Sequence, residues 1–352
     1  MNEFANTFVR QQLEATPDLI SMLCARAVDR PDHPAVVFHR SPTDPAPWTL
    51  SYGELSTQVQ AVVAGLRSAD LEPSRGIAIL SPSTPEAVAA FIGATAVGAA
   101  FPLNPLLAPE AMSAQLVLGR VGAAFVAPEH PLIDHQARLS AALGLASVVE
   151  LLIELPLQGR ASAADWRQLR GTWKPARAVS LGACALAADR PAALFHTGGT
   201  TGEPKLAELS ARGLAAGALM SAAALNLQAS DRIVIALPLF HVGGAITCTF
   251  ATLAAGATAI FCGVLGAREP DLPSRIWNFL AATAATAVAM VPTSLGTVVK
   301  TSVADADLGR LRGVITGASP LSPRLASDLE HLLDVPVCQV FGMTELSGIC
   351  TA

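Results

Sequence analysis

The chain has 352 residues, 51% of them hydrophobic and 14% charged, and its formal net charge is −5. This length is enough for about two domains and a substantial buried core, which excludes a small scaffold held together by disulfides or metal. The negative charge and the scattered Lys and Arg residues exclude a generally basic surface, so nucleic acid is not expected as a partner.

Short apolar runs of strand length alternate along the chain with Ala- and Leu-rich stretches of helical length. This alternation is typical of an α/β protein with mainly parallel sheets. We expect a helix at residues 85–98 and strands, in chain order, at residues 76–80, 123–127, 192–195, 206–209, 233–237, 257–261, 313–316 and 335–340. Ser210 is placed to cap a further helix. Residues 155–190 are polar, Ala-rich and irregular, which predicts a surface excursion.

Two long uncharged stretches, residues 233–267 and 281–299, raise the alternative of a membrane protein. Pro238 and the pair Gly243-Gly244 interrupt the first stretch, and Pro292 interrupts the second, so neither reads as a continuous lipid-facing helix. Buried parallel strands also read as unbroken apolar runs. We therefore expect no membrane span, while peripheral membrane contact stays open. Residues 1–10 lack an apolar signal core, which favours a cytoplasmic location.

Six cysteines are spread widely through the chain and form no Cys-x-x-Cys pair. Such spacing gives no support to a zinc site or a disulfide framework. We predict that the cysteines are small buried hydrophobes in a reducing compartment. They are Cys24, Cys184, Cys248, Cys262, Cys338 and Cys350.

The strongest local motif is Thr-Gly-Gly-Thr-Thr-Gly-Glu-Pro-Lys at residues 197–205, directly after an expected strand. Glycines allow backbone N–H groups to approach an anion, and the hydroxyls and the lysine supply further donors. Pro204 before the lysine distinguishes the motif from a Walker P-loop. A flexible surface loop is the alternative. We predict a polyphosphate site made by Thr197, Gly198, Gly199, Thr200, Thr201, Gly202 and Lys205.

This loop resembles the signature of the adenylate-forming superfamily, which holds acyl-CoA synthetases, luciferases and the adenylation domains of peptide synthetases. Gly198 stands where many relatives carry a serine. Further stretches resemble the superfamily's other conserved blocks and occur in its order. They are residues 50–55, 98–105, 237–244, 291–292, 317–321 and 339–345.

The resemblance implies a role for each matched residue. Without it, His241 would pass for a core histidine, Phe341 for a core side chain and Glu345 for a solvated carboxylate. The implied acyl-substrate pocket contains His241, Val242, Gly243, Val291 and Pro292. The implied adenine and AMP site contains Gly317, Ala318, Ser319, Gln339, Phe341, Gly342 and Thr344. Glu345 is the implied ligand of Mg²⁺, a cation that prefers carboxylate and phosphate oxygens.

The resemblance also implies a fold of two packed αβα subdomains with mainly parallel sheets. Residues 70–225 would form the first, with the phosphate loop, and residues 15–60 plus 230–352 the second, with the acyl and adenine segments. The whole chain, 1–352, would be an incomplete N-terminal AMP-binding domain. The family's later β-barrel part and mobile C-terminal domain would be missing, and exposed apolar surface is expected near residues 341–352.

The implied activity is ATP-dependent conversion of a carboxylic acid to acyl-AMP and then to an acyl-CoA thioester. ATP, Mg²⁺ and coenzyme A are the implied cofactor and co-substrates, and a fatty acid is the favoured acid. Because the chain stops at Ala352, we expect it to have little or no activity alone. The alternatives are a non-catalytic ATP- or AMP-binding protein and an acyl-AMP ligase that loads a carrier protein. The sequence does not indicate an oligomeric state.

Overall fold

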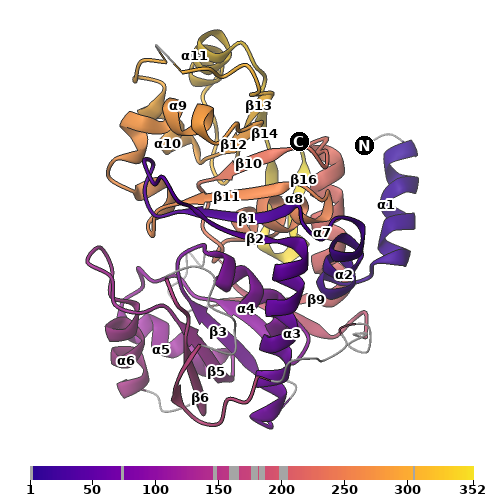
Figure 1. Ribbon diagram of the computed structural model, residues 1–352, viewed down its shortest axis with the longest axis vertical. Helices are drawn as coiled ribbons and strands as arrows, with labels where there is room; N and C mark the ends of the chain where they lie inside the picture. Colours follow the sequence, from indigo (N-terminus) through magenta and orange to yellow (C-terminus); the bar gives the residue numbers. More distant parts are fainter. Residues whose placement is uncertain are drawn as a thin grey trace.

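The computed structural model describes residues 3–72, 75–145, 149–157, 166–175, 181, 187–197, 205–303 and 306–352. These residues form two seven-stranded sheets, one above the other, with helices between the sheets and on their outer sides (Figure 1). The sequence prediction of two packed α/β units with mainly parallel sheets is confirmed.

The upper sheet combines two strands from the start of the chain with five from its second half. All its neighbouring strands are parallel except the pair β1 and β2. Its order is β14 (Val337–Gln339), β13 (Gly313–Thr316), β12 (Ala287–Ala289), β10 (Arg232–Ile235), β11 (Thr258–Cys262), β1 (Pro34–His39) and β2 (Trp48–Ser51).

The lower sheet uses only the middle of the chain. It is parallel at its centre and has an antiparallel strand at each edge. Its order is β7 (Arg167–Arg170), β6 (Leu151–Glu154), β5 (Val121–Val126), β3 (Gly76–Leu80), β4 (Ala99–Pro102), β8 (Pro191–Thr197) and β9 (Lys205–Ser210).

Three layers of helices cover the faces of these sheets. The central layer contains α2 (Leu19–Asp29), α3 (Tyr52–Ser68), α4 (Pro85–Thr95), α7 (Ala211–Ala224) and α8 (Ala251–Ala254), with α1 (Glu3–Ala15) packed against α7. The upper outer layer contains α9 (Leu272–Ala282), α10 (Pro292–Val298) and α11 (Pro323–Leu333). The lower outer layer contains α5 (Pro109–Leu118) and α6 (His135–Leu145).

Alternate side chains of one strand enter different cores. In β3, Ile77 and Ile79 pack into the central core, whereas Ala78 and Leu80 pack into the lower one. Successive strand side chains point to opposite faces, so a strand covered on both faces must be apolar at every position. This burial accounts for the uncharged runs. Among the described residues, no helix combines the length and apolarity needed to cross a bilayer.

Local capping signals place the central helices. Ser51 and Glu54 form a capping box at the start of α3, and Thr84 caps α4 with Pro85 in the first turn. The Ser210 hydroxyl accepts from Gly213 N–H at 3.1 Å, which confirms the predicted cap of α7. The helix expected at residues 85–98 ends at Thr95, because the chain must turn into β4.

Two predictions from composition were wrong. The surface excursion expected at residues 155–190 is wrong at Trp166 and Trp173, since both are buried and stack with ring centroids 6.3 Å apart beside Phe125. Aromatic burial outweighs the polar composition there. Residues 158–165, 176–180 and 182–186 lie outside the described residues. The cysteines are not all buried: Cys350 is exposed, while Cys24 and Cys338 are half-buried. None of the five that the structure describes takes part in a disulfide, and Cys184 lies outside the described residues.

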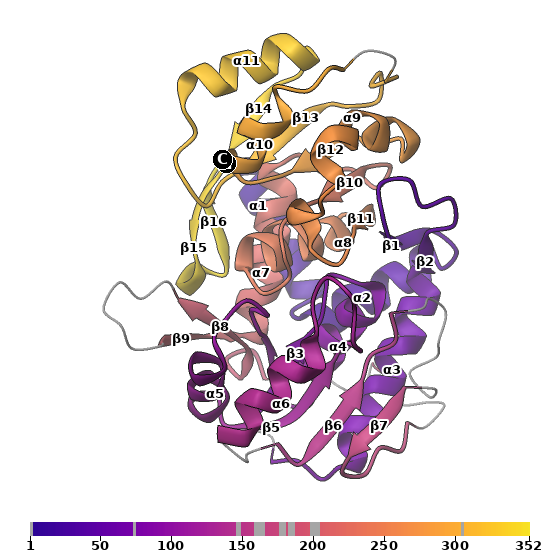
Figure 2. The same ribbon diagram turned by 90° about the vertical axis from the view of Figure 1, so that its left-hand side faces the viewer.

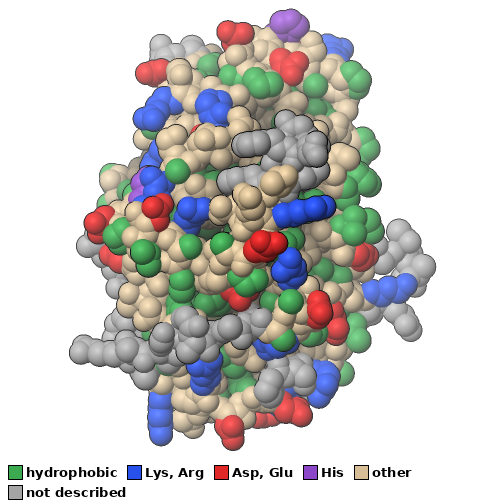
Figure 3. Space-filling model, turned by 90° about the vertical axis from the view of Figure 1, so that its right-hand side faces the viewer, with side chains coloured by type: hydrophobic (Ala, Val, Ile, Leu, Met, Phe, Trp, Pro, Cys, Tyr) green, Lys and Arg blue, Asp and Glu red, His purple; other side chains and the backbone are tan. Residues whose placement is uncertain are grey.

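A C-terminal hairpin leaves the upper sheet and reaches the strands β8 and β9 (Figure 2). It consists of β15 (Phe341–Met343), the short turn η5 (Thr344–Leu346) and β16 (Gly348–Thr351). Its apolar side chains Phe341, Met343 and Leu346 are 66%, 44% and 58% exposed, as expected for residues 341–352. On the face drawn in Figure 3, Lys and Arg side chains are spread among acidic and apolar ones.

Candidate functional site between the two sheets

A cavity of about 310 Å³ lies where the carboxyl ends of parallel strands from both sheets meet. Ligands of open α/β sheets bind at such edges, because loops rather than further strands follow there. The lower sheet contributes the residues after β3 and β4, with Ile133 and His135. The upper sheet contributes residues 235–241, 261–268, Val291, Thr293 and Ser294. A hollow of about 470 Å³ beside Pro191 lies at amino ends of strands and is a weaker candidate.

Two of the predicted acyl-pocket residues, His241 and Val291, line this cavity. Val242, Gly243 and Pro292 follow them in the chain but are not part of its lining. His241 N–H donates to the Pro238 carbonyl at 3.2 Å, which closes the turn after β10. The π-helix η3 (Gly243–Phe250) begins immediately afterwards. Such helices are rare and are found frequently at functional sites.

An aromatic cluster joins the acyl segment to the strand that precedes the phosphate motif. The ring of His241 lies 5.4 Å from those of His196 and Phe240, measured between centroids. Burial lowers the pKa of His196, and burial followed by the nearby His196 lowers the pKa of His241. Both imidazoles are therefore neutral near pH 7 and act as hydrogen-bonding groups rather than cations.

Thr197 and Lys205 are directly paired across β8 and β9, so the predicted phosphate loop is the connection of this hairpin. Gly198, Gly199, Thr200, Thr201 and Gly202 lie outside the described residues. The turn Thr344–Leu346 packs against both strands, which brings Glu345 to the same hairpin. Glu345 is exposed.

The predicted adenine residues gather at the ends of β13 and β14 rather than in the cavity lining. Ala318 adopts φ of 68°, and a Cβ on Gly317 would lie 2.8 Å from the Val340 carbonyl oxygen, so the turn after β13 requires glycine there. Gln339 pairs with Thr316 across the two strands. Phe341 and Gly342 lie on β15, and Ser319 and Thr344 lie in the adjoining turns.

Magnesium ligation by protein groups alone does not fit the described residues, which contain no group of three or more His, Cys, Asp or Glu side chains placed to hold a metal. One carboxylate with phosphate oxygens is a common arrangement for Mg²⁺, and the exposed Glu345 beside the β8–β9 hairpin suits it if that hairpin holds a phosphate as predicted.

Sequence reasoning missed the lower wall of the cavity. Ser81 and His135 contribute to it, although no motif marks them, and so does Asn104, whose block at residues 98–105 was assigned no site role. The available signal was their position, because Ser81 directly follows the predicted strand at residues 76–80. Residues after buried parallel strands gather at one edge.

Comparison with known proteins shows which family the chain resembles. The model of the AMP-binding enzymes, described as "AMP-binding enzyme", matches residues 23–352. The chain belongs to this family. The recognition made from the ordered motifs is confirmed.

Relatives among the AMP-binding enzymes are named as acid–CoA ligases. An indoleacetate–CoA ligase of Aromatoleum aromaticum is 30% identical over 85% of this chain and 56% of its own length. A 4-coumarate–CoA ligase of Oryza sativa subsp. japonica is 28% identical over 86% of this chain and 53% of its own length. The chain thus spans about half the length of these relatives.

The fold is shared with solved AMP-binding enzymes. The inhibitor-bound N-terminal domain of FACL13 from Mycobacterium tuberculosis superposes with a TM-score of 0.76 at 22% identity, covering 94% of this chain and 77% of that one. An anthranilate CoA ligase in complex with anthranoyl-AMP gives a TM-score of 0.76 at 18% identity, covering 94% of this chain and 60% of that one.

Proposed function

We propose that this chain is the part of an AMP-forming acid–CoA ligase that binds ATP and a carboxylic acid and brings them together. One observation carries the proposal: the ends of the phosphate loop, the turn with Glu345 and the His196–His241 cluster all meet at the β8–β9 hairpin beside the cavity. The relatives' names as acid–CoA ligases support the same reaction class.

In this reaction a carboxylate oxygen attacks the α-phosphorus of ATP, and the bond to pyrophosphate breaks. The thiol of CoA then attacks the acyl carbon, and AMP leaves. The protein's task is positioning and charge neutralisation, because little covalent help is needed. Thr197 and Lys205, with the loop between them, would hold the leaving pyrophosphate. Neutral His241 would orient the acid without adding charge at the reacting centre.

Glu345 would hold Mg²⁺ together with phosphate oxygens, and the ion would neutralise charge on the phosphates. Thr344, next to it in the same turn, would donate to a phosphate oxygen. The turn after β13, with Gly317, Ala318 and Ser319, would contact adenine together with Gln339, Phe341 and Gly342. Coenzyme A is the proposed acceptor, in line with the relatives' names.

The acid is better assigned to the aryl acids, whether arylacetic or hydroxycinnamic, than to the fatty acids favoured by the sequence. Relatives named for indoleacetate, coumarate and ferulate support this choice. The cavity wall formed by Leu237, Phe261 and Val264 suits an aromatic ring, and about 310 Å³ is at the small end of ligand pockets.

The test is calorimetric titration of the purified chain with ATP, followed by ATP–pyrophosphate exchange with indoleacetate, 4-coumarate and hexadecanoate. We expect ATP binding and, because this chain alone is expected to have little or no activity, at most weak exchange that an aryl acid stimulates more than hexadecanoate. ATP binding with no binding of any of these acids in matching calorimetric titrations would favour a non-catalytic nucleotide-binding protein. Absence of ATP binding would overturn the proposal.

A further inference from the structure

The lower wall of the cavity carries buried polar atoms that have no hydrogen-bond partner among the described residues. His135 is 0% exposed, and neither of its ring nitrogens has a hydrogen bond within the described part of the chain. The Ser81 hydroxyl oxygen is likewise buried and unpaired there. Both residues line the cavity. Buried polar groups are nearly always hydrogen-bonded, and the cavity is the space next to both residues from which a partner could reach them.

The surroundings define the chemistry of that partner. Burial, and then the neighbouring charges of His130 and Arg138, lower the pKa of His135 to about 4, so its ring is neutral near pH 7. A neutral imidazole offers one donor and one acceptor, and the Ser81 hydroxyl offers both functions. Their complement is a neutral group that donates and accepts, such as a hydroxyl or an amide. A carboxylate or phosphate would lack a cationic partner at these two side chains.

The opposite wall of the cavity differs in character. Leu237, Phe261 and Val291, which come from the ends of upper-sheet strands, make part of it apolar, while His241 and Arg268 add polar and charged groups. A ligand that fits both walls therefore has an apolar body with one polar group directed to the lower sheet. Such a division between apolar walls and a few convergent polar groups is usual for small-molecule sites.

We propose that His135 and Ser81 form a polar subsite that binds a neutral hydroxyl or amide group of the small molecule held in this cavity. The inference rests on the proposed function and specifies its substrate class: an aryl acid with a hydrogen-bonding group away from its carboxylate. The same chemistry occurs in the amides of a pantetheine thiol, and the experiment separates these two sources.

The test compares two acids that differ by one hydroxyl, 3-(4-hydroxyphenyl)propanoate and 3-phenylpropanoate, in calorimetric titrations of the full chain. Pantetheine is titrated separately. We expect the hydroxylated acid to bind about tenfold more tightly, the effect of one well-made hydrogen bond to groups that are otherwise unpaired. In Ser81→Ala and His135→Phe the ratio of the two affinities should fall towards one.

Ser221→Ala is the matched control, because the Ser221 hydroxyl is also buried and unpaired but lies on α7 and outside the cavity lining. It should keep the full preference. If the two subsite variants lose pantetheine binding and the wild type shows no preference between the acids, the subsite exists and binds the amide groups of pantetheine. If neither the acid pair nor pantetheine responds to the variants, the proposal is wrong.

Two readouts keep the outcomes distinct. Thermal unfolding by circular dichroism reports whether each variant folds, and Ser81→Ala decides the result if His135→Phe does not. ATP binding is measured on the same samples. Retained ATP binding with no hydroxyl or pantetheine effect refutes the subsite alone, whereas absent ATP binding refutes the proposed function.

Discussion

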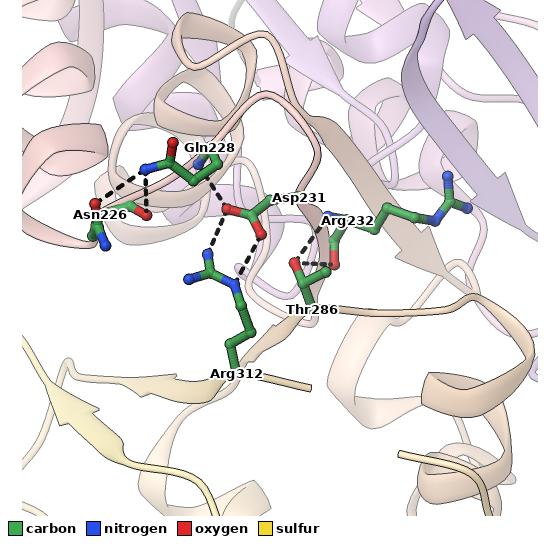
Figure 4. A network of polar contacts seen from close by, with 6 residues as sticks. All are labelled: Asn226, Gln228, Asp231, Arg232, Thr286 and Arg312. Carbon is green, nitrogen blue, oxygen red and sulfur yellow. Dashed lines mark hydrogen bonds and ion pairs between the residues drawn. The ribbon is translucent and has the colours of Figure 1, made fainter. Parts of the chain in front are cut away.

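The guanidinium of Arg312 donates two hydrogen bonds to the carboxylate of Asp231, at 2.7 and 3.2 Å, across 81 positions of sequence (Figure 4). Gln228 N–H donates a third bond to the same carboxylate at 2.7 Å. Asp231 directly precedes β10, and Arg312 directly precedes β13. The pair therefore fixes the amino ends of two strands whose carboxyl ends lead into the cavity lining and the turn proposed to contact adenine.

Replacing Arg312 by Met tests this link. The side chain of Asp231 is 2% exposed, so the variant leaves a buried carboxylate with one hydrogen bond. Because Arg312 is itself 47% exposed, we expect the free energy of unfolding to fall by about 2 kcal/mol, less than for a fully buried pair. Urea denaturation measures it. Arg324→Met, at a pair 3.8 Å apart with a 92% exposed arginine, should change little.

The buried carboxyl group of Glu86 should make the free energy of unfolding depend on pH. Burial raises the pKa of this carboxyl from 4.5 to about 7. Ionisation therefore disfavours the folded state: the stabilising contribution is complete below pH 4.5 and is lost as pH rises through about 7. Glu86→Gln cannot ionise, so it should be more stable than the wild type by about 3 kcal/mol at pH 8.

The difference between Glu86→Gln and the wild type, measured by urea denaturation from pH 4 to 8, should grow between pH 4.5 and 7 and then stay constant. Histidines with lowered pKa, such as His135, act in the opposite direction, since their contribution is lost as pH falls. They are common to both proteins and cancel in the difference. A constant difference across this range would contradict the assignment.

Gly217→Ala should loosen the C-terminal hairpin from α7. A Cβ at this position would lie 2.2 Å from the Ser347 carbonyl oxygen, which is backbone and can yield only if the hairpin moves. We expect a loss of about 2 kcal/mol in the free energy of unfolding and faster amide exchange in residues 348–351. Gly144→Ala, in helix α6 with nothing within 4 Å, makes the same change in open space and should stabilise slightly.

Lys205→Ala tests the phosphate site. Lys205 begins β9 opposite Thr197, and its ammonium would pair with phosphate oxygens of ATP. We expect about tenfold weaker ATP binding in calorimetry, because a charge-assisted contact is lost. Lys300→Ala removes an equally exposed lysine just after α10 and should leave the affinity unchanged. Equal affinities for the two variants would remove Lys205 from the site.

The strands and their caps were predictable because their signals are local. Residues 76–80 and 313–316 are apolar runs bounded by breakers, and each is a strand with those bounds in the structure. Ser210 could be assigned as a cap because its side chain acts within one turn. Composition did not predict the burial of Trp166 and Trp173, because both pack against the ring of Phe125, which comes from another part of the chain.

The sequence by itself determined the family, the mainly parallel α/β fold and the short motifs to which ATP binding is assigned as a proposal, since each depends on contiguous residues. Only the tertiary structure decided that His196 lies against His241, that Glu345 reaches the β8–β9 hairpin, and that Ser81 and His135 share one cavity wall. The physical reason is that parallel strands place their carboxyl ends at one edge whatever their separation in sequence. No local pattern records which loops meet there.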